Sequence, residues 1–99
     1  MGYYTDYKLK AEPNIMGEEF AVLFHRTTQY WLDYLKEIKW YNHDEDMMEI
    51  SNLYPDVLFT LDGNGEGFGD IWRTFYKNGK MQKTKANMVF DKFDETKLI

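Results

Sequence analysis

The pair Asn78-Gly79, which lies between two runs rich in aromatic and β-branched residues, most constrains the fold. A two-residue turn of type I′ needs positive φ at both central positions, which asparagine and glycine tolerate best. The pair therefore predicts a β-hairpin between residues 71–76 and a return strand that runs to residue 90. A turn of this length also fixes the register of the two strands. The predicted register pairs are Tyr76 with Met81, Trp72 with Lys85, and Ile71 with Ala86.

Two segments before the hairpin have the pattern of strands. Residues 3–12 alternate, with charged side chains on one face only, which is typical of a half-exposed strand. Residues 57–61 are apolar on both faces, as expected for a central strand. Together with the hairpin, these segments predict an antiparallel sheet made of an N-terminal strand and a C-terminal three-stranded meander.

Two segments have the helical period. Residues 18–39 place apolar side chains at three- and four-residue steps, although Thr27-Thr28 weakens the middle and allows a break there. A second helix is predicted from Asn42, which has the spacing of a capping box with Glu45, and Pro55 ends it. The chain is therefore expected to be a single α+β domain over residues 1–99, with two helices on one face of an antiparallel sheet. The stripe of the first helix predicted to face the core is Phe20, Leu23, Phe24, Thr27, Trp31, Tyr34, Leu35 and Ile38.

The charged residues fall in two blocks of opposite sign. Residues 41–70 include eight acidic and no basic side chains, whereas residues 71–92 include six basic and one acidic. Such blocks predict either neutralisation across the fold or two faces of opposite potential. The acidic residues predicted to form one partner-binding surface are Asp44, Glu45, Asp46, Glu49, Asp62, Glu66 and Asp70.

The residues that carry catalytic or metal chemistry are sparse. The loop 62–70 follows part of the EF-hand calcium pattern, but Arg73 stands where a bidentate glutamate is needed. His25 and His43 are the only histidines, Ser51 is the only serine, and there is no cysteine. No nucleophile–base pair follows from these residues. We therefore expect neither an enzyme nor a bound metal or cofactor.

The hairpin supplies an alternative binding surface. Basic side chains interleaved with aromatic ones would hold single-stranded nucleic acid through phosphate contacts and base stacking. Lysine on an exposed strand also protects a sheet against edge-to-edge pairing, so the pattern has a structural explanation as well. The residues of this alternative site are Trp72, Arg73, Lys77, Lys80, Lys83 and Lys85.

The chain also resembles a known group of proteins over residues 40–82. The strings that carry the resemblance are Trp40-Tyr41-Asn42-His43-Asp44-Glu45-Asp46-Met47, Tyr54-Pro55-Asp56-Val57-Leu58-Phe59, Gly65-Glu66, Gly69-Asp70-Ile71-Trp72 and Tyr76-Lys77-Asn78-Gly79-Lys80-Met81-Gln82. They are similar to small uncharacterised proteins encoded by phages and prophages. The resemblance implies a compact α+β domain, similar to ferredoxin-like folds, in a mobile-element setting. It brings no catalytic residues.

Together these patterns predict a non-catalytic, phage-type interaction protein that binds and inhibits a host protein. Its acidic surface would imitate nucleic acid, in an anti-CRISPR or other counter-defence role. The sequence has neither a long apolar stretch nor an apolar N-terminal run, so we expect the host cytoplasm and no membrane contact. The alternatives are single-stranded nucleic-acid binding through the hairpin 71–85 and a homodimeric assembly component.

Overall fold

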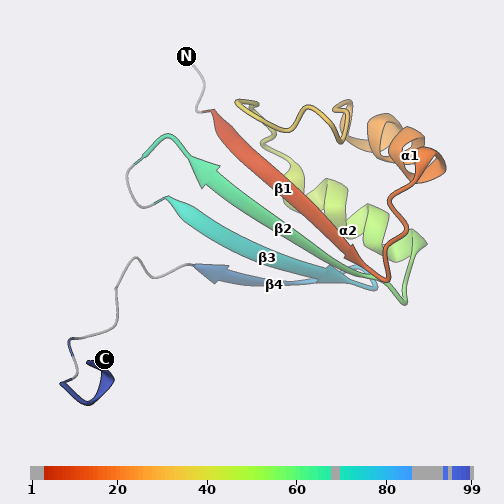
Figure 1. Cartoon of the computed structure of the whole chain (residues 1–99). Coiled ribbons are helices and arrows are strands. Elements are labelled where there is room, and N and C mark those ends of the chain that lie inside the picture. The colour runs from red at the N-terminus through yellow and green to blue at the C-terminus, as the bar shows by residue number, and fades with distance from the viewer. Residues whose placement is uncertain (1–3, 68–69, 86–92, 94, 99) are drawn as a thin grey trace.

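The structure is a computed structural model that describes residues 4–67, 70–85, 93 and 95–98. Its elements, in chain order, are β1 (Thr5–Glu12), α1 (Glu18–Thr28), α2 (His43–Leu53), β2 (Leu58–Gly65), β3 (Ile71–Lys77), β4 (Lys80–Lys85) and a short 3₁₀ turn (Glu95–Lys97) (Figure 1). The strands form one antiparallel sheet in the order β1-β2-β3-β4.

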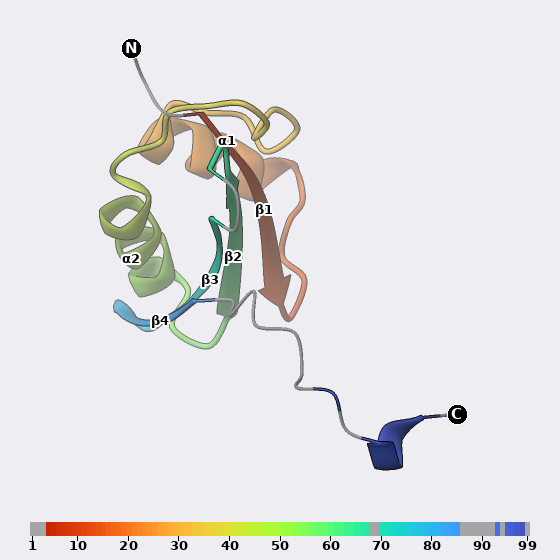
Figure 2. The ribbon, with the colours of Figure 1, turned by 90° about the vertical axis from the view of Figure 1, so that its left-hand side faces the viewer.

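Both helices lie on one side of the sheet, which confirms the predicted α+β class (Figure 2). The two layers are those of ferredoxin-like folds. The connectivity is β-α-α-β-β-β, in which both helices precede β2, whereas ferredoxin-like chains alternate as β-α-β-β-α-β. The predicted ferredoxin-like topology is therefore not confirmed, and the likeness is limited to the arrangement of two layers.

The hairpin between β3 and β4 forms as predicted. Asn78 and Gly79 have φ values of 52° and 73°, which is the type I′ requirement. Tyr76 faces Met81, and Trp72 faces Lys85. The third predicted pair, Ile71 with Ala86, lies outside the described residues, as does the end of the predicted return strand.

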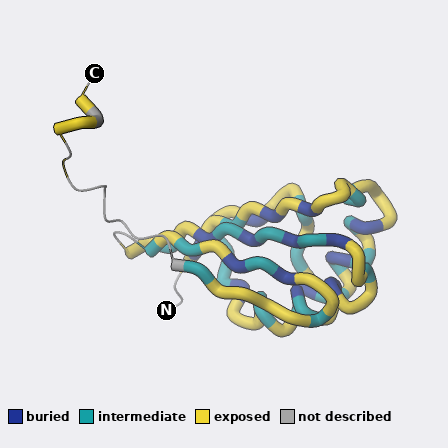
Figure 3. The backbone as a smooth tube through the Cα atoms, turned by 90° about the horizontal axis from the view of Figure 1, so that it is seen from below, coloured by how far each residue is buried: buried dark blue, intermediate teal, exposed yellow. Residues whose placement is uncertain are grey.

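Side chains alternate along the strands between a buried and an exposed face (Figure 3). The buried face packs against the helices because its apolar residues fall at every second position. Phe20 of α1, for example, stacks on Phe59 of β2 at 5.7 Å between ring centroids. The buried apolar core comprises Leu9, Ala11, Phe20, Phe24, Leu35, Trp40, Met47, Ile50, Val57, Phe59, Leu61 and Tyr76.

The prediction of one helix over residues 18–39 is wrong, because α1 ends at Thr28. The Thr28 hydroxyl donates to the Phe24 carbonyl at 2.8 Å and accepts the Tyr30 N–H at 3.0 Å. Gln29 then adopts a left-handed conformation with φ of 70°. Threonine thus stabilises the end of the helix by offering the backbone an alternative hydrogen-bond partner.

The segment 29–42 runs beside β1 instead of continuing the helix. Thr5 and Ile38 exchange backbone hydrogen bonds of 3.0 and 3.1 Å. Leu35 is buried as predicted, but Trp31 and Tyr34 are 48% and 76% exposed and were wrongly assigned to the core. The helical period continued in the sequence past the point where the helix ends.

The second helix and the central strand differ from the prediction in detail. Asn42 is at the N-cap of α2 as expected, but its side chain makes no capping hydrogen bond, so the predicted capping box with Glu45 is wrong. Strand β2 begins close to the predicted position and continues to Gly65. Residues 62–65, which were predicted to belong to a loop, therefore pair with β1, and residues 62–64 also pair with β3.

The second face of the sheet is called the open face here, because no helix covers it within the described part of the chain. The charged side chains of β1, with those of Asp62 and Arg73, project from this face, as the strand alternation requires. Neither helix described has the length and apolar character needed to cross a bilayer.

Candidate functional site

The first turn of α2 is positioned on the sheet by Trp72. Trp72 lies opposite Gly63 in the register of β2 and β3. A Cβ atom at Gly63 would lie 2.2 Å from the indole, so only glycine lets the ring lie against the strand. His43 of α2 stacks on the same indole, with ring centroids 4.8 Å apart and an interplanar angle of 22°.

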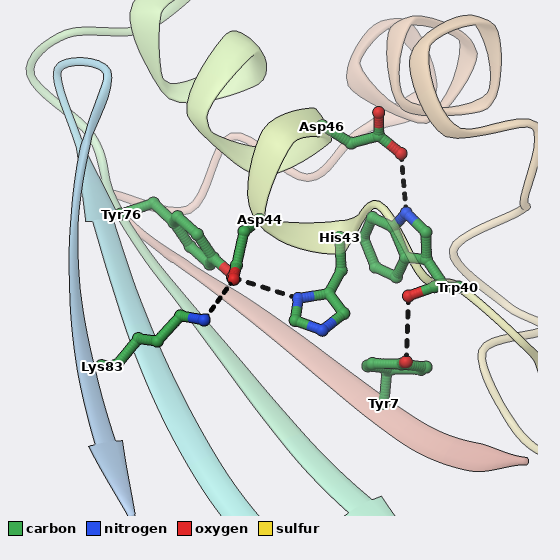
Figure 4. A network of polar contacts seen from close by, with 7 residues as sticks. All are labelled: Tyr7, Trp40, His43, Asp44, Asp46, Tyr76 and Lys83. Atoms are coloured by element: carbon green, nitrogen blue, oxygen red, sulfur yellow. Dashed lines mark hydrogen bonds and ion pairs between the residues drawn. The ribbon is translucent and has the colours of Figure 1, made fainter. Parts of the chain in front are cut away.

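Asp44 joins this turn to both strands of the hairpin (Figure 4). The Tyr76 hydroxyl donates to Oδ1 at 2.6 Å, and Lys83 Nζ lies 2.6 Å from Oδ2. His43 Nδ1 lies 3.1 Å from Oδ1. Burial raises the pKa of Asp44, but the hydrogen bonds from Lys83 and Tyr76 outweigh burial, and the pKa lies below its usual value. Asp44 is therefore charged at neutral pH.

Burial also lowers the pKa of His43, and nearby Lys83 lowers it further, although Asp44 opposes both. The net pKa lies below the usual histidine value, so the imidazole is neutral at neutral pH. A neutral ring beside a carboxylate carries its proton on Nδ1 and donates it to Asp44. Nε2 is then a hydrogen-bond acceptor.

A second pair of contacts fixes Trp40 behind His43 (Figure 4). Trp40 Nε1 donates to Asp46 Oδ2 at 2.7 Å, and the Tyr7 hydroxyl donates to the Trp40 carbonyl at 3.2 Å. Burial raises the pKa of Asp46, and repulsion from Glu49 and Glu45 raises it further against the hydrogen bond from Trp40. The first two turns of α2 therefore concentrate negative charge.

Two recesses border this cluster. The first, called the aromatic recess here, has a volume of about 200 Å³, and the second has about 440 Å³. His43, Asp70 and Trp72 line both of them. The other lining residues of the aromatic recess are Thr5, Tyr7, Trp40 and Tyr41. Those of the second recess are Lys83 and two threonines. The arrangement is suited to binding a small polar or cationic group.

The contacts of Ser51 do not prepare its hydroxyl to act as a nucleophile. The Ser51 hydroxyl donates to the Met48 carbonyl at 2.9 Å and accepts the Gly79 N–H at 2.9 Å. Ser51 therefore holds the hairpin turn against α2. Within the described ranges, no three His, Cys, Asp or Glu side chains gather to hold a metal ion.

The seven predicted acidic residues are not brought together on one continuous surface. Glu45, Asp46 and Glu49 share α2, but Asp44 turns toward Lys83. Asp62 projects from the open face, where the Arg73 guanidinium donates to both of its oxygens, at 2.6 and 2.9 Å. The two others lie near the end of the sheet: Glu66 Oε1 accepts the Tyr4 N–H at 2.9 Å, and Asp70 lines the recesses.

The predicted basic site is likewise divided between the two faces of the sheet. Arg73, Lys77 and Lys80 belong to the open face, whereas the strand positions of Trp72, Lys83 and Lys85 alternate toward the helices. The side chain of Lys85 is outside the described part of the chain.

Lys8 and Lys10 of β1 join Arg73 on the open face, and sequence reasoning missed them. The hydrogen bond from Arg73 lowers the pKa of Asp62, and Lys10 and Lys8 lower it further. The alternation of residues 3–12 was the signal that could have found these lysines. The aromatic recess was also missed, because its residues come from β1, the 29–42 segment, α2 and β3.

Comparisons of the chain with protein-family models, with curated proteins and with solved structures find no match. The resemblance to phage-encoded proteins therefore stays a prediction, and the functional argument depends on the geometry of the site.

Proposed function

We propose that the protein is a non-catalytic binding protein that contacts a basic partner protein through the start of α2. The proposed surface, called the acidic helix face here, consists of Glu45, Asp46 and Glu49 with the neighbouring Tyr41. The observation that carries the proposal is the position of Glu45 and Glu49, which are exposed on the same helix as Asp46. Burial raises the pKa of Asp46, and repulsion from Glu49 and Glu45 raises it further. A basic partner would relieve that repulsion.

The exposed aromatic ring beside these carboxylates supports a protein partner. Tyr41 is 69% exposed and lies just before Asn42, the N-cap of α2. Tyrosine is enriched among the residues that dominate binding energy at protein interfaces. Charge steers the encounter, and the ring provides contact area once the partner is in place.

The resemblance to phage proteins supports a host target and a cytoplasmic setting. A host protein that binds nucleic acid has the basic surface which the acidic helix face would occupy, and occupation would inhibit it, as in anti-CRISPR or other counter-defence proteins. The acidic helix face is smaller than the acidic surface predicted from the sequence. Lys83 neutralises Asp44 and Arg73 neutralises Asp62 within the chain itself.

Affinity capture from host lysate, followed by mass spectrometry, tests the proposal. The variant Glu45→Lys/Glu49→Lys reverses the charge of the proposed face. Glu18→Lys/Glu19→Lys is the matched control, since it makes the same change of net charge at exposed positions in the first turn of α1. We expect the captured partner to bind the first variant about ten-fold more weakly and the control nearly as well as wild type.

The affinity of the identified partner is also measured at two salt concentrations. The wild-type affinity should fall as salt rises, because screening weakens exposed charge pairs. Equal binding by both double variants would show that partner recognition does not use the acidic helix face.

A specific observation favours single-stranded nucleic-acid binding by the open face as the second candidate. The basic residues of this face outnumber its acidic residues Asp6, Glu12 and Asp62; they are Lys8, Lys10, Arg73, Lys77 and Lys80. The phosphate groups of a single strand would bind these basic side chains, and the half-buried ring of Phe75 on the same face would contact a base. A low-salt gel shift that is lost in Lys8→Gln/Lys10→Gln, but kept in Lys83→Gln, would support this candidate over the first.

A homodimeric role remains a proposal with less support. Strand β4 is at one edge of the four-stranded sheet, where a second copy would pair. Lys80 and Lys83 are exposed on that strand and would repel their counterparts in a paired copy. A concentration-dependent increase of mass in light scattering would favour the dimer.

A further inference from the structure

The Tyr7 ring meets both indoles of the aromatic recess at steep angles, whereas His43 stacks on the Trp72 indole. The Tyr7 ring approaches Trp40 at 5.3 Å and 66°, and approaches Trp72 at 5.8 Å and 69°. His43 lies between the two indoles, at 6.2 Å from Trp40 and 4.8 Å from Trp72. Tyr41 completes the lining and is largely exposed, so it forms the rim. These rings border a recess instead of closing into a single stack.

The charges around the recess favour a cation. The faces of aromatic rings are negative, and the lining includes the exposed ring of Tyr41 and the acidic residue Asp70. His43 is neutral at neutral pH and does not repel a positive group. No lysine or arginine occurs among the described residues that line the recess. Tyr41 belongs both to this lining and to the acidic helix face, and α2 begins two residues later at His43.

We infer that the aromatic recess binds an alkylammonium group, namely the side-chain ammonium of a lysine on the partner protein. Its volume of about 200 Å³ admits an ammonium group with its methylene or methyl substituents. Aromatic side chains are the usual partners of such groups, and added methyl groups increase the contact with the rings. This inference rests on the proposed function, because the acidic helix face would guide the basic partner to the recess.

The probe that tests the inference is tetramethylammonium chloride, with sodium chloride as the matched salt. Indole N–H resonances in the NMR spectrum report on Trp40 and Trp72 at the recess. Trp31 is the internal control, because it stacks on His25 outside the recess. We expect saturable shifts of the Trp40 and Trp72 resonances with tetramethylammonium only, and no saturable shift of Trp31.

Variants of the rim residue sharpen the test. Tyr41→Ala should weaken binding of the probe about five-fold, whereas Tyr41→Phe should restore it, because the ring face and not the hydroxyl contacts the cation. Tyr34→Ala is the matched control, since Tyr34 is an exposed tyrosine of the same segment that does not line the recess. It should bind as wild type does.

Equal shifts with the two salts would overturn the inference, and so would unchanged binding by Tyr41→Ala. The titration uses no partner protein, so its outcome is independent of the capture experiment. If the protein does not bind tetramethylammonium but Glu45→Lys/Glu49→Lys weakens partner binding as expected, the recess is not a cation site and the proposed function stands. The opposite pair of results would keep the recess as a cation site and reject the acidic helix face.

Discussion

Asp44 connects three elements through one carboxylate. Its oxygens contact the Tyr76 hydroxyl of β3, Lys83 of β4 and His43 of its own helix. A charged carboxylate with several donors avoids most of the cost of its partial burial. Asp44 is therefore a structural residue, although its place in the acidic block made it a candidate for partner binding.

The variant Tyr76→Phe tests this role because it removes a single donor from Asp44. Tyr76 is fully buried, and the partly exposed Asp44 keeps its contacts with Lys83 and His43. We expect the free energy of unfolding to fall by about 1 kcal/mol in urea, with an unchanged slope. The pKa of Asp44 should also rise. Tyr34→Phe, at an exposed tyrosine, should leave the stability near wild type, and an equal loss in both variants would contradict the role of the Tyr76–Asp44 hydrogen bond.

The pKa of His43 predicts how stability depends on pH. Because burial lowers this pKa in the folded protein, the unfolded chain binds a proton more readily as pH falls. The contribution of His43 is therefore complete above its unfolded pKa of 6.5 and is lost progressively as pH falls below it. We expect the free energy of unfolding to decrease between about pH 7.5 and 5.5 more steeply in wild type than in His43→Gln. Parallel curves would show that His43 is not responsible.

At the scale of the elements, local signals predicted much of the fold. The hairpin followed from Asn78-Gly79, and the faces of β1 followed from its alternation, because these features depend on neighbours in the sequence. The end of α1 was harder to predict, since Thr28 and Gln29 stop the helix while the apolar period continues beyond them. Trp31 was then wrongly assigned to the core.

The candidate site could not be predicted from local patterns, because it depends on register. Gly63 belonged to a predicted loop, and only its pairing opposite Trp72 shows why the indole lies there. Similarly, the opposite charge blocks predicted either neutralisation or separate faces, and the structure contains both. Asp44 meets Lys83 across the elements, while Glu45 and Glu49 remain exposed on α2.

Gly63→Ala tests the packing of β2 against β3. The new methyl group would lie 2.2 Å from the Trp72 indole, so the ring must move and lose its stack with His43. We expect a loss of about 1–3 kcal/mol in the free energy of unfolding, with a changed Trp72 indole resonance. Gly17→Ala is the control, since nothing lies within 4 Å of its new methyl group. It should cost less than Gly63→Ala and leave the Trp72 resonance in place.

At the scale of the whole molecule, the two layers carry different charge. The helix layer holds Glu45 and Glu49 at the start of α2, whereas on the open face the basic side chains, among them Lys8 and Lys10, outnumber the acidic side chains of Asp6, Glu12 and Asp62. A partner would therefore meet opposite potentials on opposite sides of the sheet. Because of this polarity, the two candidate functions use separate surfaces. The variants Glu45→Lys/Glu49→Lys and Lys8→Gln/Lys10→Gln therefore distinguish them.

The topology also predicts the order in which the sheet forms. Strands β2, β3 and β4 are consecutive, whereas β1 pairs with β2 across both helices and the segment between them. Closing that long connection costs more conformational entropy than closing the hairpin. We therefore expect the meander to be formed in the folding transition state and β1 to join the sheet later.

Two buried positions, one on each side of that boundary, test the order. Thr74→Ala in β3 and Ala11→Gly in β1 should each cost about 1 kcal/mol, enough for reliable kinetic analysis. Stopped-flow folding in urea should show that Thr74→Ala mainly slows folding, because its contacts exist in the transition state. Ala11→Gly should mainly speed unfolding, because its contacts with Phe59 form afterwards. If Ala11→Gly slowed folding instead, β1 would pair early, and the entropy of the long connection would not control the order of assembly.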